Sequence, residues 1–261
     1  MKALHIAASG MAAQELNVEV ISNNIANMRT TGFKRQRADF QDLLYEKLRR
    51  PGASTSDTGT IVPVGIEIGG GVKTAATPRV MSQGDIAGTE KELDVAIRGE
   101  GFFRVRLPDG RTAYSRDGSF ERDSVGQLVT IDGYIIEPGV TIPDDARSIS
   151  ISSEGLIQAF TGTDSAPIDL GTIDLARFVN KGGLESIGDN LFLETPSSGT
   201  EQVGTPGSEG FGSLEQGYLE LANVNPVSEI SDLIAAQRAY EMNSRVISAA
   251  DEMMSSTANI R

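Results

Sequence analysis

The chain has few residues whose types and spacing could carry out chemistry. Histidine is the side chain best suited to proton transfer and metal binding near neutral pH, and the 261 residues include one, His5, and no cysteine. Without cysteine, disulfides and thiolate metal sites are excluded. His5 lies in a helical pattern with no catalytic partner in view. We therefore predict no metal site and no histidine-based catalysis.

Two glycine-containing stretches resemble nucleotide-binding loops only in part. A phosphate-binding loop needs glycine directly before Lys-Ser/Thr, but Val72 precedes Lys73-Thr74. The segment Gly99-Glu100-Gly101 lacks the third glycine and the following helix of a dinucleotide site. Several acids stand in turn-like sequences and are interpreted as turn formers: Asp109, Asp117, Asp132, Asp144 and Asp145. The aromatic content of 5% leaves little surface on which a sugar substrate could stack, so a glycosidase site is not expected. The sequence predicts a protein that is not an enzyme and uses no cofactor.

The charge of the chain argues against nucleic acid as a partner. The net charge is −13, and residues 1–28 carry only one lysine and two glutamates. Residues 226–261 carry three arginines and five acids, so most of the negative charge lies between the two ends. Nucleic acid needs a basic surface. The only basic run is interpreted as a solvated helix flank rather than a phosphate contact: Arg29, Lys34, Arg35 and Arg37.

The N-terminal segment is not expected to cross or enter a membrane. No apolar run reaches the roughly 18 residues that a membrane-spanning helix needs. The first residues resemble a weak signal peptide, but His5, Ser9 and Gly10 interrupt the apolar run. The helical pattern also continues beyond it. We therefore expect this segment to be kept rather than cleaved.

The N-terminal 28 residues predict a long amphipathic helix. Apolar residues recur at the heptad spacing typical of a coiled-coil seam. A dense polar motif, residues 22–27, ends the pattern, and Gly32 is a plausible helix stop. The two rows of the seam, apolar at seven of eight positions, are Leu4, Met11, Val18 and Ile25, and Ala7, Gln14, Ile21 and Met28.

The C-terminal residues predict a second amphipathic helix. Asn225 can cap its first amides, and Pro226 suits the first helical position. Apolar residues occupy two faces, which indicates burial on more than one side and contacts with several chains. One face holds Ile230, Leu233, Tyr240, Ile247 and Met254; the other holds Ala235, Ala239, Met242, Val246, Ala249, Met253 and Ile260.

The middle of the chain reads as antiparallel hairpins. Residues 39–50 are predicted to be helical, 53–60 to form an exposed loop and 61–72 a strand. Turn sequences at 108–110, 132–133 and 153–155 separate short apolar runs, so residues 95–190 are predicted to form a β domain. Residues 195–212 are predicted to be a flexible return loop. The fold class is therefore α+β, with paired coiled-coil-like terminal helices and an antiparallel middle, as expected of a polymer subunit.

Four motifs, taken together, resemble the bacterial flagellar axial proteins, the family of rod and hook subunits. They are ISNNIANMRTTGFKR at 21–35, the segment from Gln83-Gly84 to Phe102-Phe103, YSRDGSF at 114–120, and residues 219–254 with ANVNP and QRAYEMN. They cover almost the whole chain in the family's order. The closest resemblance is to distal-rod subunits, because residues 46–68 occupy the position of their extra segment. Met28-Arg29, where small residues are common, and Pro226 depart from the pattern.

This resemblance implies a homopolymer in the basal body, exported by the flagellar type III pathway without a cleaved signal and crossing the periplasm. It implies proximal rod proteins, hook protein, P-ring and L-ring proteins, the export apparatus and a rod cap as partners. It also implies three parts: 1–35 with 222–261 as the inner helices, 36–94 with 191–221 as a connecting β-rich part, and 95–190 as the outer domain.

Residues expected to carry assembly lie on the terminal helices, and residues expected to keep the polymer straight lie in segment 46–68. The assembly set is Leu4, Met11, Val18, Ile21, Asn24, Ile25, Asn27, Ile230, Leu233, Gln237, Tyr240, Asn243, Ile247 and Met254. The straightness set is Glu46, Pro51, Gly52, Ile61, Pro63, Ile66 and Ile68. The alternatives are a hook or proximal rod subunit, or an exported β-rich enzyme or adhesin.

Overall fold

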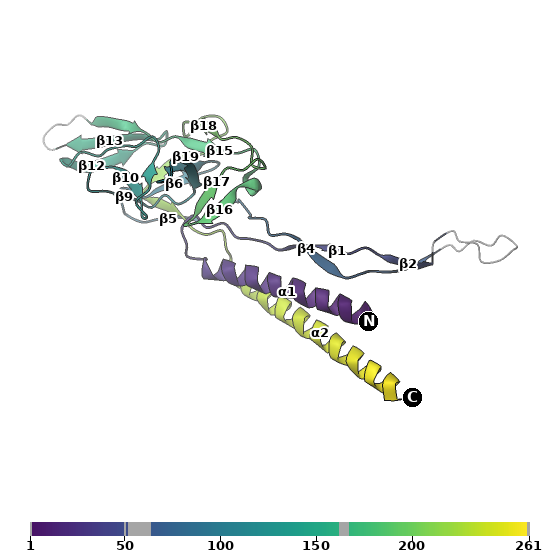
Figure 1. Cartoon of the computed structure of the whole chain (residues 1–261). Coiled ribbons are helices and arrows are strands. Elements are labelled where there is room, and N and C mark those ends of the chain that lie inside the picture. The colour runs from purple at the N-terminus through teal and green to yellow at the C-terminus, as the bar shows by residue number, and fades with distance from the viewer. Residues whose placement is uncertain (1, 50, 52–63, 162–166, 260–261) are drawn as a thin grey trace. The chain divides into compact units, whose positions relative to one another are not determined.

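The computed structural model describes residues 2–49, 51, 64–161 and 167–259 (Figure 1). It forms two compact units, each built from segments far apart in the sequence. Unit 1 combines Met1–Ile25, Gln36–Pro78 and Asn225–Arg261. Unit 2 combines Ala26–Arg35 and Arg79–Val224. Both ends of the chain therefore belong to unit 1.

Unit 1 contains two helices, α1 (Lys2–Ala26) and α2 (Pro226–Asn259). The side-chain oxygen of Asn225 accepts hydrogen bonds from the amides of Val227 and Ser228, at 3.0 and 3.3 Å. The predicted cap and first helical residue are therefore confirmed. The helices approach closely at Gly10, where an added Cβ would lie 2.9 Å from the amide nitrogen of Asn243.

A two-stranded arm completes unit 1. β1 (Asp39–Asp42) pairs with β4 (Val72–Ala76), and β2 (Glu46–Arg49) pairs with β3 (Ile66–Ile68), both antiparallel. The amide of Val72 donates to the hydroxyl of Ser9 at 3.3 Å, and Lys2 pairs with Glu46, so the arm lies along α1. The helix predicted over 39–50 is wrong. Its helix-like spacing of leucines was overridden by backbone pairing with residues 66–76.

Unit 2 is built on a nine-stranded sheet with the path β16-β17-β8-β7-β11-β10-β9. β15 pairs with β7 and with β18 at the side of this path. The pairings are antiparallel. The strands are β7 (Phe102–Arg106), β8 (Thr112–Ser115), β9 (Phe120–Arg122), β10 (Leu128–Thr130), β11 (Ile135–Ile136), β15 (Leu175–Arg177), β16 (Glu185–Gly188), β17 (Leu191–Leu193) and β18 (Gln202–Gly204).

Three smaller sheets and one short helix complete unit 2. β12 (Ala146–Ile151), β13 (Leu156–Thr161) and β14 (Ile168–Thr172) form a three-stranded sheet. β6 (Val95–Arg98) pairs with β19 (Ser213–Gln216), and β5 (Ile86–Gly88) pairs with β20 (Tyr218–Glu220). A 3-10 turn, η1, covers Lys181–Gly183.

The three hairpins predicted from turn sequences are confirmed as β7–β8, β10–β11 and β12–β13. The return loop predicted over 195–212 is only partly correct, because it contains β18. The terminal helices and the antiparallel middle confirm the α+β class. The core of unit 2 is aliphatic with a few edge-on aromatic pairs, such as Phe103 with Phe120 at 4.9 Å between ring centroids.

Candidate assembly surface

A buried ionic cluster holds Lys34, which belongs to the motif at 21–35, inside unit 2. The carboxylate of Glu220 accepts from the Lys34 ammonium at 2.5 Å, the Arg116 guanidinium at 3.1 Å and the Gly84 amide at 2.9 Å. Lys34 and Glu220 are each 1% exposed. Burial lowers the pKa of Lys34, while the Glu220 carboxylate acts in the opposite direction. The cluster therefore joins residues from both ends of unit 2.

This cluster corrects the interpretation of the basic run. Lys34 is buried and ion-paired, so the solvated-flank prediction is wrong for it, whereas Arg37 is exposed and pairs with Asp39. Arg116 also donates to the Gly99 carbonyl at 2.8 Å and lies 5.3 Å above the Phe102 ring. Sequence reasoning missed the cluster because the three charges are far apart in the chain. The signal available was Lys34 beside the apolar Phe33.

Asn223 is a second anchor in unit 2. Its side-chain oxygen accepts from the Arg35 amide at 2.8 Å, and its amide donates to the Val80 carbonyl at 2.8 Å and the Ser82 carbonyl at 3.0 Å. Gly32 makes the same region compact, because its φ of +68° and an added Cβ 2.7 Å from the Asp117 amide both require glycine. Two of the sequence motifs thus meet in unit 2.

Asn24 is the anchoring side chain of unit 1. Its side chain exchanges two hydrogen bonds with the backbone of Gln36, both at 2.8 Å, and donates to the Glu229 carboxylate at 3.1 Å. Asn24 and Glu229 are buried. One side chain therefore ties the end of α1 to the start of the arm and the first turn of α2.

The predicted assembly residues of the N-terminal segment lie mostly on covered faces. Ile21 and Asn24 are buried, and Leu4, Met11, Val18 and Ile25 are half-buried within unit 1. Asn27 follows α1, lies in unit 2 and accepts a hydrogen bond from Thr30 at 3.2 Å. The chain's own arm and α2 thus cover much of α1.

On α2 the chain covers one stripe and leaves the rest open. The covered stripe has spacings of three or four residues and runs through Glu229, Leu233, Ala236, Ala239, Asn243, Ile247 and Ala250. The predicted assembly residues Ile230, Gln237, Tyr240 and Met254 are exposed. Other large apolar side chains of α2 are exposed as well: Val227, Ile234, Met242, Val246 and Met253.

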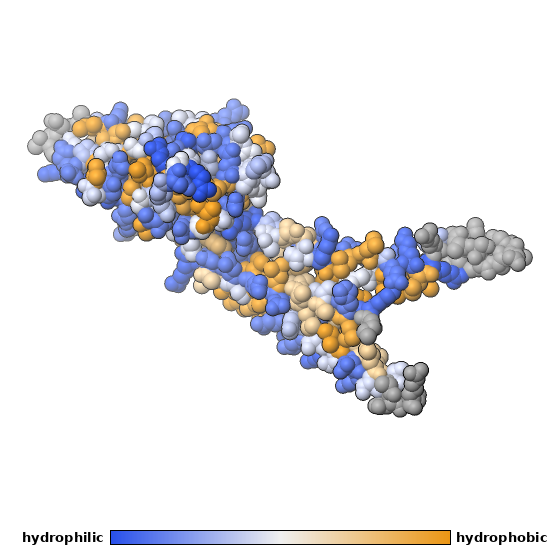
Figure 2. Space-filling model, in the orientation of Figure 1, coloured by the Kyte–Doolittle hydropathy of each residue, from blue (hydrophilic) through white to orange (hydrophobic). Residues whose placement is uncertain are grey.

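The arm adds further exposed apolar side chains. Leu44 is 92% exposed, and Leu48 and Val64 are also largely open. Of the predicted straightness residues, Glu46, Ile66 and Ile68 lie exposed in β2 and β3, and Pro51 is in a turn. Gly52, Ile61 and Pro63 lie outside the described residues. Figure 2 shows apolar residues gathered over the helices and arm.

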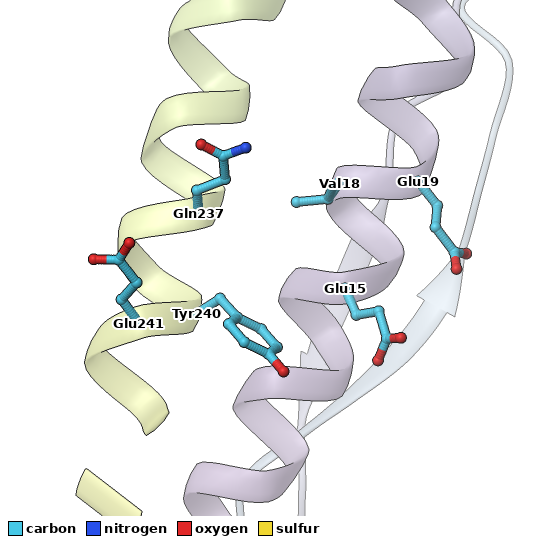
Figure 3. A pocket seen from close by; sticks show the side chains of 6 residues that line it. All are labelled: Glu15, Val18, Glu19, Gln237, Tyr240 and Glu241. Carbon is cyan, nitrogen blue, oxygen red and sulfur yellow. The ribbon is translucent and has the colours of Figure 1, made fainter. Parts of the chain in front are cut away.

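A groove runs between α1 and α2 (Figure 3). Its volume is about 400 Å³, and it is lined by Glu15, Val18, Glu19, Gln237, Tyr240 and Glu241. Val18 and Tyr240 project toward the space between the helices, while the three glutamates lie along its edges. The groove is therefore apolar at its centre and acidic at its rims.

The residues considered for chemistry are scattered. His5 is exposed on α1 at the edge of a second hollow that includes Leu44 and Ile68. Asp117 and Asp132 share a small hollow with Asp189 in unit 2. Within the described part of the chain, no three His, Cys, Asp or Glu side chains are placed to hold a metal ion. No helix among the described residues is long and apolar enough to cross a membrane.

Comparisons with known proteins match the helices and the sheet unit separately. The profile of the flagella basal body rod protein family matches residues 4–34, and that of the flagellar basal body rod FlgEFG protein C-terminal region matches 215–260. The flagellar hook protein FlgE/F/G D1 domain matches 96–159. The chain is 56% identical to the flagellar basal-body rod protein FlgG of Caulobacter vibrioides over 261 residues, all of both chains. The chain belongs to the flagellar basal-body rod protein family.

Other rod proteins match over nearly the same length. The FlgG of Agrobacterium fabrum is 50% identical, over 98% of this chain and 97% of the relative. That of Bacillus subtilis is 36% identical, over 100% and 99%. This rod protein is accordingly a structural component of the flagellar basal body and not an enzyme.

Proposed function

We propose that this rod protein polymerises into the distal rod, a straight, hollow helical drive shaft that transmits motor torque to the hook and lines the export channel. The observation that carries the proposal is the open apolar surface of α2, of which the chain covers a single stripe. Repeated contacts between different patches, when they do not close a ring, generate a helical filament. The full-length similarity to rod proteins favours a rod over a hook subunit.

The proposed surroundings follow from that place in the basal body. The polymer would join proximal rod proteins at one end and hook protein at the other, inside the P-ring and L-ring. Subunits would arrive through the flagellar type III export apparatus, without a cleaved signal, and would be added beneath a rod cap. The completed rod would span the periplasm. The acidic composition of the middle segments would limit adhesion to the rings.

The proposed layers assign a role to each part. Residues 1–35 with 222–261 would form the inner layer around the channel, 36–94 with 191–221 a connecting layer, and 95–190 the outer layer. In unit 1, apolar side chains left open on α2 would be buried by neighbouring copies. In unit 2, an aliphatic core is already buried within one chain.

Segment 46–68 is proposed to keep the rod straight. Its described strands, β2 and β3, expose Leu48, Ile66 and Ile68, which could wedge between neighbouring copies. We expect deletion of 46–68 to give curved or unstable polymers. Straight rods of normal stability from the deletion variant would contradict this assignment.

Electron microscopy of the concentrated purified protein tests the polymer proposal. The full chain should form straight tubes, and a variant lacking residues 1–28 and 226–261 should form none. Equal assembly by the truncated variant would overturn the role of the helices. If neither form assembles alone, the same two chains are compared in basal bodies from cells lacking the native gene, where the full chain should restore the rod and the truncated one should not.

A further inference from the structure

Three Asp-Gly pairs lie in turns of unit 2, at 109–110, 117–118 and 132–133. An aspartate before glycine can rearrange without an enzyme, because glycine has no side chain to shield its amide nitrogen. That nitrogen attacks the carboxyl carbon of the aspartic acid side chain, water leaves, and a five-membered succinimide forms. Water then opens the ring. Opening at the main-chain carbonyl leaves isoaspartate, whose backbone is one carbon longer, so the net change is an isomerisation without a co-reactant.

Two of these pairs occupy turns of the same geometry. The Gly110 amide donates to the Leu107 carbonyl at 3.0 Å, and the Gly133 amide donates to the Thr130 carbonyl at 2.9 Å. The backbone φ is +85° at Gly110 and +84° at Gly133, and an added Cβ would meet no atom within 4 Å at either position. Both are three-residue hairpin loops with glycine in the left-handed region. A difference in their reactivity must therefore come from what surrounds the aspartate.

Arg111 holds the first aspartate, and no residue holds the second. The carboxylate of Asp109 accepts from the Arg111 amide at 3.0 Å and from the Arg111 guanidinium at 2.6 Å. These bonds lower the pKa of Asp109, which reduces the share of neutral acid able to lose water. Asp132 is exposed, and its side chain makes no hydrogen bond or ion pair within the described residues. Its carboxyl group is therefore free to turn toward the Gly133 amide.

The hairpin behind Asp132 is also the more weakly paired of the two. The attacking glycine amide is engaged in the bond that closes the turn, so the turn must open before the succinimide forms. β10 and β11 pair at one position, Val129 with Ile135, whereas β7 and β8 pair at four. Fewer pairs lower the free energy of local opening. The turn at 132–133 should therefore open more often than the turn at 109–110.

The third pair, Asp117 with Gly118, is enclosed. The carboxylate of Asp117 accepts from the amide of Ser119 at 3.0 Å and from its hydroxyl at 2.6 Å. Gly118 is buried, and an added Cβ would collide with the Val95 carbonyl oxygen. The succinimide brings the side-chain carbon of the aspartate onto the glycine nitrogen, and this packing leaves no room for it.

We propose that Asp132-Gly133 is a site of spontaneous isoaspartate formation, while the fold protects Asp109 and Asp117 from the same reaction. The product belongs to the substrate class of protein-isoaspartate methyltransferases, which methylate the α-carboxylate that the rearrangement leaves free. The extra backbone carbon lies in the loop between β10 and β11, so it disturbs the closing bond from the Thr130 amide to the Tyr134 carbonyl. β11 also pairs with β7, near the middle of the nine-stranded sheet. The site is independent of the proposed polymer, because it needs only folded unit 2.

Ageing of the purified full chain tests the site, because trypsin separates the three pairs into peptides 107–111, 117–122 and 123–147. The chain is kept for weeks at neutral pH and digested, and electron-transfer fragmentation locates isoaspartate in each peptide. We expect isoaspartate at Asp132 to accumulate roughly tenfold faster than at Asp109 or Asp117, about the factor that two hydrogen bonds contribute. Equal accumulation at all three positions, or none at Asp132, would overturn the proposal.

The unfolded chain separates the effect of the fold from that of the local sequence. In guanidinium the three aspartates should isomerise at similar rates. The same preference for Asp132 in the unfolded chain would place its cause in the neighbouring residues and overturn the structural argument.

Two variants test the roles of the individual residues. Arg111→Gln removes the guanidinium bond to Asp109 and should raise isoaspartate there several-fold, measured in the longer peptide 107–116, without changing the rate at Asp132. An unchanged rate at Asp109 would overturn the protective role of Arg111. Asp132→Glu keeps the charge but would need a six-membered ring, so methyltransferase labelling of peptide 123–147 should fall to the level of the fresh chain. Labelling that persists at the parent level would place the reaction at another residue of that peptide.

Discussion

The two units of the chain bury different things. Unit 2 encloses an aliphatic core and a cluster of three charged side chains, Lys34, Arg116 and Glu220, each at most 3% exposed. Unit 1 buries small residues such as Ala7 and Ala236 and leaves large ones such as Met242 and Met253 open. A buried side chain of ordinary apolar size stabilises by roughly 1.5–3 kcal/mol. Unit 2 thus gains its stability within one chain, while unit 1 has apolar surface left for its neighbours.

This difference fits the proposed role of a subunit that assembles into a polymer. A subunit that is complete everywhere would gain nothing from assembly, and one that is open everywhere would aggregate. In the proposed polymer, unit 2 would fold within one chain, and association would order unit 1. Segments that fold on association give up part of the binding free energy for ordering.

Amide hydrogen exchange on the monomer should show the largest contrast. We expect the core strands of unit 2, such as β7 and β13, to be protected about a thousandfold more than α1 and α2, because local opening spans from near zero to the full unfolding free energy. Exchange is read by mass spectrometry at a concentration where light scattering confirms a monomer. Strong protection of residues 2–26 in that monomer would contradict the division.

Removing the central carboxylate should damage unit 2 next most strongly. Glu220→Ala leaves Lys34 and Arg116 buried without their counter-charge, which costs about 3–5 kcal/mol of unfolding free energy. Guanidinium unfolding of unit 2, followed by circular dichroism of the full chain, measures it. Glu121→Ala is the control, since its pair with Lys91 is exposed and such pairs contribute about 0–1 kcal/mol. Equal losses would show that burial does not distinguish the two sites.

Local patterns in the sequence predicted the parts of the fold that local forces decide. Asn225 and Pro226 gave the start of α2, and three turn sequences gave three hairpins. The helix predicted over 39–50 is wrong, because β1 and β2 form there by pairing with β4 and β3, which lie between residues 66 and 76. Neither periodicity nor turn residues encode such pairing at a distance.

The contacts of the candidate assembly surface were likewise predictable only where local patterns encode them. Apolar periodicity gave the helix faces, and the polar motifs pointed to residues that do make contacts, such as Asn24 and Asn223. The Lys34, Arg116 and Glu220 cluster could not be predicted, because ion pairing across 186 positions has no local signature. Which faces of α2 stay open also depends on where α1 and the arm lie, which the sequence pattern alone does not determine.

Asn24→Ala should be a smaller change, limited to unit 1. It removes one hydrogen-bond donor to the Glu229 carboxylate and both side-chain hydrogen bonds to the Gln36 backbone, which costs about 1–3 kcal/mol locally. We expect faster exchange at the end of α1 and fewer rods, with the unfolding midpoint of unit 2 unchanged. Ser22→Ala, at an exposed position on the same helix, is the control. A shifted unit 2 midpoint would indicate that the units are energetically coupled.

The smallest expected effect is a decrease in the unfolding free energy of unit 2 at alkaline pH, caused by Tyr114. Burial, and then the neighbouring Glu201 carboxylate, raise the pKa of the Tyr114 phenol well above its usual value of 10. The folded state therefore keeps a proton that the unfolded state loses above pH 10. Stability from this group is complete below pH 10 and is lost at about 1.4 kcal/mol per pH unit above it.

Lys34 contributes with the opposite sign, because its pKa is lowered on folding. Between its folded pKa and 10.5, the unfolded state binds more protons, so its contribution makes stability rise with pH. Comparing the parent chain with Tyr114→Phe cancels the contribution of Lys34, since Lys34 is present in both. Guanidinium unfolding at pH 9 and pH 11 should show a loss about 1.4 kcal/mol smaller in Tyr114→Phe. Tyr240→Phe, on the exposed face of α2, should keep the parent slope, and equal slopes in all three chains would place the alkaline sensitivity outside Tyr114.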